Sequence, residues 1–197
     1  LVPVQDQRVL DPEDFDKTNL SSYKLKFSTS APLRIGIKQQ IVARWPGKML
    51  EIYGLTEGGG STILSCTDFP TKLESVGVPA ETADIRLIDA EGNELAQGEI
   101  GEVVGRSQGM MAGYYKRQDL TDDMLWQSPE GITFFRTGDM GRFDEDGFLF
   151  LLDRIKDMII SGGFNIYAAD LEAVLTDHPD VADIAVIGIP SDQWGET

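Results

Sequence analysis

The fold is decided by residues 24–53, whose sequence is KLKFSTSAPLRIGIKQQIVARWPGKMLEIY. Residues 24–28 read as a strand, Ala31-Pro32 as a turn, residues 35–45 as a helix with apolar side chains at helical spacing, and residues 49–53 as a second strand. The pattern predicts a βαβ unit in a parallel sheet, because its crossover helix joins parallel strands. Ligands of such sheets lie beyond the carboxyl ends of the strands, so we expect function at residues 28–30 and 54–57.

After this unit the pattern changes to short apolar runs separated by Gly, Asp and Asn. The predicted strands are residues 84–88, 100–105, 133–136 and 148–152, with hairpin turns at 89–93 and 144–147. Together they predict a β-rich subdomain. The end of the chain alternates again, with a helix expected at residues 168–176 and a strongly apolar strand at 181–188. A separate α+β lobe is therefore predicted to begin after residues 153–156.

The composition limits the possible functions. The chain has 197 residues, 41% of them hydrophobic, so it can bury the core of one domain or of parts of two. A formal net charge of -16 makes nucleic acid an unfavourable partner, although a bound divalent cation can still allow an acidic protein to hold a nucleotide. A single cysteine and a single histidine permit neither an internal disulfide nor a Cys/His zinc site. No run of about 18 apolar residues and no leader-like segment occurs, so we expect a soluble cytoplasmic protein without an integral membrane segment.

The strongest local signal is residues 53–60, YGLTEGGG, a strand end that runs into a loop with three consecutive glycines. Glycine permits close approach of the backbone to a ligand. The hydroxyl of Thr56 and the carboxylate of Glu57 suit a phosphate and its Mg²⁺ ion, which prefers oxygen ligands. A plain flexible loop explains this segment equally well when it is taken alone.

Two further segments point to a nucleotide but do not decide for it. In residues 134–139, FFRTGD, a strand delivers Arg136 and Asp139 into a predicted tight turn, and aspartate accepts hydrogen bonds from ribose hydroxyls. A surface turn with an ion pair is the alternative.

In residues 152–166, charged side chains interrupt an apolar stretch as in an interdomain connector, and Gly162-Gly163 would let the backbone lie close to a narrow ligand. An ordinary β-hairpin is the alternative here.

The order of these segments resembles the adenylate-forming superfamily, which includes acyl-CoA synthetases, peptide-synthetase adenylation domains and luciferase. The matching blocks are residues 30–33 (SAPL), 53–57, 98–105 (GEIGEVVG), 109–115 (GMMAGYY), 136–139, 153–172 and 188–190 (GIP). The resemblance implies an α/β fold in which residues 1–152 are the C-terminal part of the large AMP-binding domain. Within it lie the βαβ part (residues 20–60) and the β-rich subdomain (76–152), followed by a hinge (153–157) and the start of the small C-terminal domain (158–197).

The resemblance also implies roles for individual residues, with ATP/AMP, Mg²⁺ and coenzyme A as cofactors or co-substrate. Nucleotide contacts fall to Tyr53 at adenine, Gly54, Thr56 at the α-phosphate, Glu57 on magnesium, Asp139 on the ribose and Arg154 near ribose or phosphate, and Thr56, Glu57 and Arg154 would be catalytic. Ser30, where relatives often have glycine, and Ala31 would edge the adenine and acyl sites. Lys156 would be the hinge, and Gly162, Gly163 and Phe164 would flank the pantetheine tunnel.

The implied reaction is attack of a carboxylic acid on the α-phosphorus of ATP, followed by thioester formation with coenzyme A. Such catalysis is mostly positioning and charge neutralisation, so neither His178, expected in a helix-ending turn, nor Cys66, expected as a small buried or loop residue, needs a catalytic role. Gly58, Gly59 and Gly60 would leave room at the mouth of the acyl site, which favours a chain or ring over acetate.

The segment DMIISGGFN (residues 157–165) most resembles the CoA-ligase branch. An acyl-AMP ligase and a peptide-synthetase adenylation domain are alternatives within the enzyme class, and a non-catalytic binding module is the alternative from another class. No stretch like the family's TSGTTG phosphate loop occurs in the sequence. We therefore expect an internal fragment that is inactive alone, with the family's adenylating lysine beyond residue 197.

Overall fold

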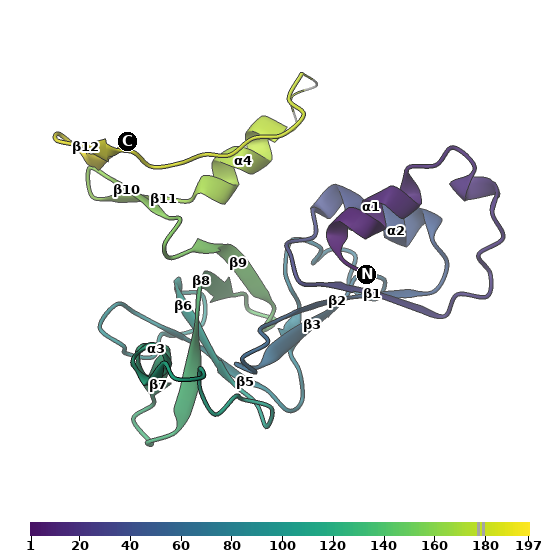
Figure 1. Ribbon diagram of the computed structural model, residues 1–197. Coiled ribbons are helices and arrows are strands. Elements are labelled where there is room, and N and C mark those ends of the chain that lie inside the picture. Colours follow the sequence, from purple (N-terminus) through teal and green to yellow (C-terminus); the bar gives the residue numbers. More distant parts are fainter. Residues whose placement is uncertain (177, 179) are drawn as a thin grey trace.

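The computed structural model describes residues 1–176, 178 and 180–197. Its strands form three sheets that follow one another along the chain (Figure 1). The helices are α1 (Pro3–Leu10), α2 (Ile35–Arg44), α3 (Gln118–Asp123), α4 (Ala168–Thr176) and the short 3-10 helix Phe15–Lys17. None of the helices in this described part of the chain is long and apolar enough to cross a membrane.

The first sheet contains the predicted βαβ unit. Its strands, in spatial order, are β1 (Leu25–Thr29), β2 (Lys48–Gly54), β3 (Ser61–Ser65) and β4 (Val78–Pro79). β1 and β2 are parallel, with Phe27 opposite Leu50, and α2 connects them, which confirms the prediction. β3 and β4 add in antiparallel fashion, so the sheet is mixed. The carboxyl ends of β1 and β2 meet at one edge, where residues 28–30 and 54–57 therefore both lie.

α2 has clear start and stop signals. It begins three residues after Pro32 and ends before Pro46, which cannot continue a helix. The amino group of Lys26 donates hydrogen bonds to the carbonyls of Trp45, Pro46 and Gly47 at 2.9, 2.8 and 2.8 Å. These bonds satisfy carbonyls that otherwise lack partners at the helix end, and they tie the end of α2 to β1.

One face of the first sheet is buried beneath α1 and α2. The buried apolar residues of this core are Leu10, Phe15, Leu33, Ile41, Trp45, Met49, Leu64, Cys66, Leu73 and Phe148. Cys66 is fully buried, as expected, and its burial raises the pKa of the thiol to about 11. The thiol therefore stays protonated at neutral pH and is a poor nucleophile, because the thiolate is the reactive form.

The second sheet is the predicted β-rich section, and all its pairings are antiparallel. Its strands are β5 (Asp84–Ile88), β6 (Gly101–Arg106), β7 (Leu125–Gln127), β8 (Thr133–Phe143) and β9 (Leu149–Arg154), in the order β5-β6-β8-β7, with β9 also paired to β8. β8 is long enough to pair with β7 near its start and with β9 near its end. Hairpin turns at residues 89–93 and 144–147 are confirmed, with positive φ at Gly92 and Gly147.

The prediction that residues 136–139 form a tight turn is wrong. They continue β8, in which Gly138 adopts φ +74°. The register of β8 with β6 is irregular across this stretch, with Glu102 opposite Met140 and Val104 opposite Arg136. A glycine beside an aspartate reads as a turn from sequence, but here its left-handed conformation gives an irregularity within a paired strand.

The third sheet belongs to the end of the chain. It consists of β11 (Phe164–Ile166), β10 (Ile159–Ser161), β13 (Gly195–Glu196) and β12 (Pro190–Ser191), in that order, with α4 beside it (Figure 1). The helix predicted at residues 168–176 is confirmed. The pair β10 and β11 is a hairpin through Gly162-Gly163, so the simpler interpretation of this segment describes its backbone.

The apolar strand predicted at residues 181–188 is wrong, because this segment lies in no sheet. The amide of Val186 donates to the carboxylate of Glu172 on α4 at 2.8 Å, where a strand partner would otherwise accept. Ile187 is 73% exposed. β10 pairs instead with β11 and β13, so both of its sides are occupied by other strands.

Candidate functional site

A hydrogen bond between Tyr53 and Asp139 joins the first two sheets. Tyr53 lies one residue before the end of β2, and Asp139 lies within β8. The phenol donates to Asp139 Oδ2 at 2.6 Å. Burial raises the pKa of Tyr53, and the neighbouring Asp139 charge raises it further, so the phenol stays a donor at neutral pH. The bond thus brings together two segments that the sequence marked separately.

Arg154 completes this cluster from β9. It lies opposite Asp139 in the β8–β9 register, and its Nε is 3.7 Å from Asp139 Oδ1. Burial raises the pKa of Asp139, while the hydrogen bond from Tyr53 and the charge of Arg154 lower it. The Arg154 side chain is 63% exposed, so its guanidinium remains available to a ligand.

Arg136 has a different partner from the one its position next to Asp139 indicates. Its guanidinium forms an ion pair with the buried Glu102 on β6, which raises the pKa of Arg136. The interpretation of residues 136–139 as a satisfied ion pair is therefore correct for Arg136, whereas Asp139 faces Tyr53.

Thr56 and Glu57 follow β2 in the loop at the carboxyl edge of the first sheet. Thr56 is exposed, and Glu57 is partly buried. Glu57 Oε1 accepts a hydrogen bond from the Tyr114 phenol at 2.9 Å. Tyr114 lies in a segment that resembles the family (residues 109–115), but the sequence predicted no role for it, because no spacing rule links positions 57 residues apart. Among the described residues no group of three or more His, Cys, Asp or Glu side chains could hold a metal ion.

The glycines of the loop approach the protein's own chain. A Cβ on Gly58 would lie 2.2 Å from the carbonyl oxygen of Gly109, and one on Gly59 would lie 3.1 Å from Cβ of Phe135. Gly58 also has φ +77°, which L-residues rarely adopt. At Gly58 and Gly59 the backbone therefore lies close to the second sheet and its loop, where the sequence predicted close approach to a ligand. The space predicted at the mouth of the acyl site is occupied at these two positions by protein atoms.

Ser30 and Ala31 lie directly after β1 at the same sheet edge, and both are exposed. Ser30 has φ +77°. This conformation is uncommon for any residue other than glycine. It explains physically why glycine suits this position.

The structure does not bring the remaining predicted residues to the Tyr53 cluster. Lys156 lies in the exposed turn between β9 and β10. Gly162, Gly163 and Phe164 form the tip of the β10–β11 hairpin, where the Gly162 amide donates to the Trp194 carbonyl at 2.8 Å and Phe164 is 76% exposed.

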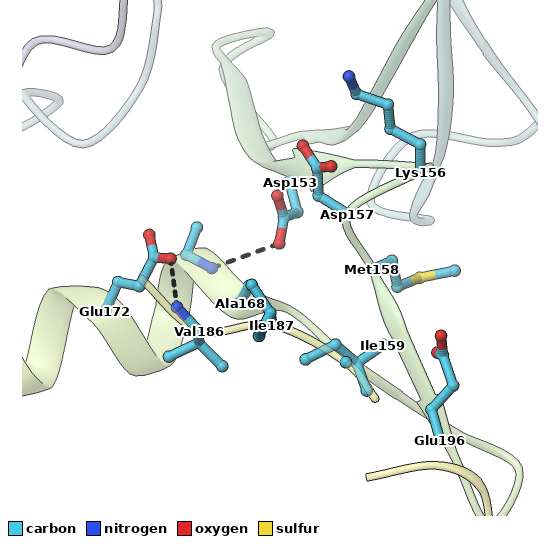
Figure 2. Close-up of a pocket in the computed structure, with 12 residues that line it drawn as sticks. Asp153, Lys156, Asp157, Met158, Ile159, Ala168, Glu172, Val186, Ile187 and Glu196 are labelled. Atoms are coloured by element: carbon cyan, nitrogen blue, oxygen red, sulfur yellow. Dashed lines mark hydrogen bonds between the residues drawn. The ribbon is translucent and has the colours of Figure 1, made fainter. Parts of the chain in front are cut away.

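A hollow lies between the connector (residues 153–157) and the last lobe (residues 158–197), and it is lined by residues of both (Figure 2). At its wall Asp153 Oδ2 accepts a hydrogen bond from the amide of Ala169 at 3.3 Å, in the first turn of α4. Asp153 therefore ties the end of β9 to the start of α4. The sequence marked this residue only as part of a charged connector.

Comparison with known proteins identifies the family. A family model described as "AMP-binding enzyme" matches residues 1–115, and one described as "AMP-binding enzyme C-terminal domain" matches residues 170–197. The chain is 34% identical over 188 residues to "Long-chain-fatty-acid--CoA ligase" of Salmonella typhimurium, covering 95% of this chain and 33% of that protein. It is 37% identical over 187 residues to "Probable 4-coumarate--CoA ligase 2" of Dictyostelium discoideum, covering 92% of this chain and 32% of that protein. The chain thus spans about a third of the length of these curated relatives.

Solved structures agree with this assignment. The amide bond synthetase McbA from Marinactinospora thermotolerans matches with a TM-score of 0.87 and 33% identity, over 100% of this chain and 39% of that one. The o-succinylbenzoate CoA synthetase MenE from Bacillus subtilis, in complex with its acyl-adenylate intermediate OSB-AMP, matches with a TM-score of 0.84 and 30% identity, over 100% of this chain and 39% of that one. The resemblance and the fold class expected from the sequence are confirmed, and the chain belongs to the family of AMP-binding enzymes.

Proposed function

We propose that this chain is part of an acyl-CoA synthetase, which uses ATP to convert a carboxylic acid into an acyl-adenylate and then transfers the acyl group to coenzyme A. The observation that carries the proposal is the convergence of Tyr53, Asp139 and Arg154 beside the loop of Thr56 and Glu57. Relatives named as CoA ligases support the same reaction class.

In this proposal Asp139 binds the ribose hydroxyls. A carboxylate accepts hydrogen bonds in several directions, so Asp139 can hold the Tyr53 phenol with one oxygen and a sugar hydroxyl with the other. Tyr53 fixes the carboxylate before the nucleotide arrives and offers a ring edge to adenine. Arg154, which is mostly exposed, places a permanent positive charge where ribose or phosphate would lie. Ser30, Ala31 and Gly54 border this place at the sheet edge.

The phosphate side of the proposed site falls to Thr56 and Glu57. Mg²⁺ is commonly held by one or two carboxylates together with substrate phosphates and waters. The described residues fit this arrangement, since Glu57 presents one carboxylate at the sheet edge, where the Tyr114 phenol holds its Oε1. Bound Mg²⁺ would neutralise charge on the phosphates. Thr56 would donate its hydroxyl to the α-phosphate, and Glu57 would orient the metal–nucleotide complex.

Adenylation needs little covalent chemistry from the protein. The acid's carboxylate oxygen forms a bond to the α-phosphorus, and the bond to pyrophosphate breaks. The chain's contribution would be to align ribose and α-phosphate and to stabilise developing charge. For the second step, Gly162, Gly163 and Phe164 would flank the pantetheine arm of coenzyme A after the lobe of residues 158–197 turns about Lys156. This division into a large-domain part (1–152), hinge (153–157) and small lobe (158–197) is part of the proposal.

A second candidate acceptor for the acyl group is an amine, because a structural neighbour with a TM-score of 0.87 is named as an amide bond synthetase. An acyl-AMP ligase and a peptide-synthetase adenylation domain share the first half-reaction. A non-catalytic binding module would bind nucleotide without turnover. We further propose that the 197 residues alone do not adenylate, because their proposed site contains Arg154 but no phosphate-loop lysine.

The test is an assay of the intact protein that contains this chain with a panel of fatty, aromatic and short acids. AMP and acyl-CoA should form in equal amounts, and both should require the acid, ATP and coenzyme A. Formation of ADP, or AMP release that an amine supports and coenzyme A does not, would contradict the CoA-ligase proposal. Nucleotide binding without turnover of any acid would favour the binding module.

A further inference from the structure

The hydrogen bond between Tyr114 and Glu57 connects the loop after β2 to the segment that follows β6. The Tyr114 phenol donates to Glu57 Oε1 at 2.9 Å, and both side chains are partly buried. Within residues 1–176, 178 and 180–197, no second side chain or amide donates a hydrogen bond to this carboxylate. One carboxylate oxygen is therefore held by the protein, and Oε2 remains for a ligand.

The backbone on either side of Glu57 is fixed to the same segment. The amide of Met111 donates to the Glu57 carbonyl at 2.9 Å, and the Ser107 hydroxyl donates to the Gly58 carbonyl at 2.8 Å. Gly58 lies so close to Gly109 that an added Cβ would reach 2.2 Å from the Gly109 carbonyl oxygen. These contacts hold the loop against residues 107–111, so Tyr114, which follows this segment closely in the chain, can set the orientation of Glu57.

Tyr114 is itself positioned by α3. Its amide donates to the Thr121 hydroxyl at 2.9 Å, and the buried Thr121 hydroxyl donates to the Arg117 carbonyl at 3.0 Å. Gly113 has φ +148°, and an added Cβ there would lie 3.0 Å from Thr121. The base of the Tyr114 side chain is thus anchored to a buried residue, which limits the positions open to its phenol.

We propose that Tyr114 is a positioning residue that orients the Glu57 carboxylate toward a divalent cation, an inference that rests on the proposed function. The phenol holds Oε1 and leaves Oε2 directed to the metal. Groups that orient a metal ligand typically contribute about 10- to 100-fold to metal affinity.

The test variant is Tyr114→Phe, which removes only the hydroxyl. Tyr115→Phe is a matched control, since Tyr115 is the next residue and is 86% exposed. In the intact protein, the Mg²⁺ concentration for half-maximal acid-dependent pyrophosphate exchange should rise about 10-fold or more in Tyr114→Phe. The rate at saturating Mg²⁺ should stay near the wild-type value, and Tyr115→Phe should match the wild type throughout.

A second readout does not need turnover. Binding of Mn²⁺ in the presence of a non-hydrolysable ATP analogue, followed by the electron paramagnetic resonance of free Mn²⁺, should weaken about 10-fold or more in Tyr114→Phe. Because Tyr114 acts through Glu57, adding Tyr114→Phe to Glu57→Gln should cause little further loss. Fully additive losses would overturn the proposal, since they would mean that Tyr114 acts independently of the carboxylate.

The outcomes separate this inference from the proposed function. Wild-type protein that exchanges pyrophosphate while Tyr114→Phe keeps the wild-type Mg²⁺ and Mn²⁺ dependence would overturn only the role of Tyr114. If the wild-type protein shows no pyrophosphate exchange with any acid and binds no metal–nucleotide complex, the proposed function and the cation role would be overturned together. Equal thermal unfolding curves for the two phenylalanine variants would establish that a loss does not come from unfolding.

Discussion

Asp139 carries a carboxylate whose charge is opposed by its surroundings. Burial raises its pKa, and the hydrogen bond from Tyr53 and the charge of Arg154 only partly offset that effect. A carboxyl group with a raised pKa in the folded state contributes stability below its unfolded pKa. That contribution is lost as the pH rises through the folded pKa. At neutral pH the ionised Asp139 therefore lowers the stability of the fold, which is typical of a residue kept for binding.

The first prediction is that Asp139→Asn separates stability from binding. The amide oxygen can still accept from Tyr53 but no longer carries a charge, so the melting temperature should rise at pH 7. The gain should shrink as the pH falls through the acidic range, where Asp139 becomes protonated. Circular dichroism melting between pH 4 and 8 measures this.

Nucleotide binding should weaken about 10-fold or more in the same variant, because charged hydrogen bonds contribute more than neutral ones. Calorimetry with AMP on the intact protein measures it. Asp89→Asn is the control for the melting temperature at pH 7, which it should lower rather than raise. Hydrogen bonds from Asn93 lower the pKa of Asp89, so the charge of Asp89 stabilises the turn. A lower melting temperature for both variants at pH 7 would contradict the account of Asp139.

The second prediction concerns Glu57→Gln. Glutamine can accept the hydrogen bond from Tyr114, so the loop should keep its place, but a neutral amide is a poorer magnesium ligand than a carboxylate. Adenylation by the intact protein should fall, with a higher Mg²⁺ requirement. The exposed Glu74 offers a matched control in Glu74→Gln. An unchanged rate and Mg²⁺ dependence in Glu57→Gln would remove Glu57 from the site.

Among the secondary-structure elements, the βαβ unit could be predicted because local signals agree. Apolar spacing in α2, the flanking prolines and the apolar runs of β1 and β2 all indicate the same fold. The strand prediction for residues 181–188 failed because an apolar run has the same sequence pattern in a strand and in an unpaired extended segment. Only the availability of a pairing partner decides between the two. The turn at residues 136–139 failed because local sequence does not show which strands pair.

The candidate site was predictable by residue type but not by contact. The sequence marked Tyr53, Asp139 and Arg154 through three separate segments. The structure joins Tyr53 to Asp139 across 86 residues of chain and places Arg154 beside Asp139. The sequence did not indicate a role for Tyr114, because Tyr114 contacts Glu57 only when the loop packs on residues 107–111. Interactions at such separations depend on tertiary structure, which spacing does not encode.

The third prediction tests what fixes β2 beneath α2. The amino group of Lys38 lies 2.5 Å from Glu51 Oε2 and donates to the carbonyls of Leu73 and Ser75, and both side chains of the pair are buried. Lys38→Met should destabilise the chain by about 3–5 kcal/mol, because it leaves a buried charge without its partner. Urea unfolding of the 197-residue chain measures this, with the exposed Lys24→Met as control.

Adding Glu51→Leu to Lys38→Met should recover most of that loss, since apolar replacement of a whole buried pair is often neutral. A double variant less stable than the single one would contradict this account of the pair.

At the scale of the whole molecule, polar contacts between the last lobe and the rest are sparse. In the described part of the chain they are the hydrogen bonds from the amides of Met158 to the Arg154 carbonyl at 3.1 Å and of Ala169 to Asp153 at 3.3 Å, and an exposed ion pair between Arg34 and Asp183 at 3.9 Å. Figure 1 shows β10 to β12 standing apart from the first two sheets, whereas α4 begins beside the end of β9. Exposed ion pairs of this kind contribute about 0–1 kcal/mol, so the Arg34–Asp183 pair would oppose the proposed rotation about residues 153–157 only weakly.

The fourth prediction is that Lys156→Pro separates the two half-reactions. Proline fixes φ near about -65° and restricts the preceding residue, so the turn between β9 and β10 should be held near one orientation. Single-turnover rates of acyl-AMP formation and of thioester formation from preformed acyl-AMP should then fall by different factors in the intact protein. Lys156→Ala is the control for loss of charge alone. Equal losses in both steps, or none in either, would mean that Lys156 is not the pivot.

In the proposed function, the edge formed by Tyr53, Thr56, Glu57, Asp139 and Arg154 activates a carboxylic acid with ATP. The most direct measurement is acid-dependent exchange of labelled pyrophosphate into ATP by the intact protein, in the wild type and in Asp139→Asn. We expect exchange that requires an acid and Mg²⁺ and that falls about 10-fold or more in the variant at subsaturating ATP, because charged hydrogen bonds to ribose are lost. Absence of exchange with every acid of a broad panel, or exchange unchanged by Asp139→Asn, would contradict it.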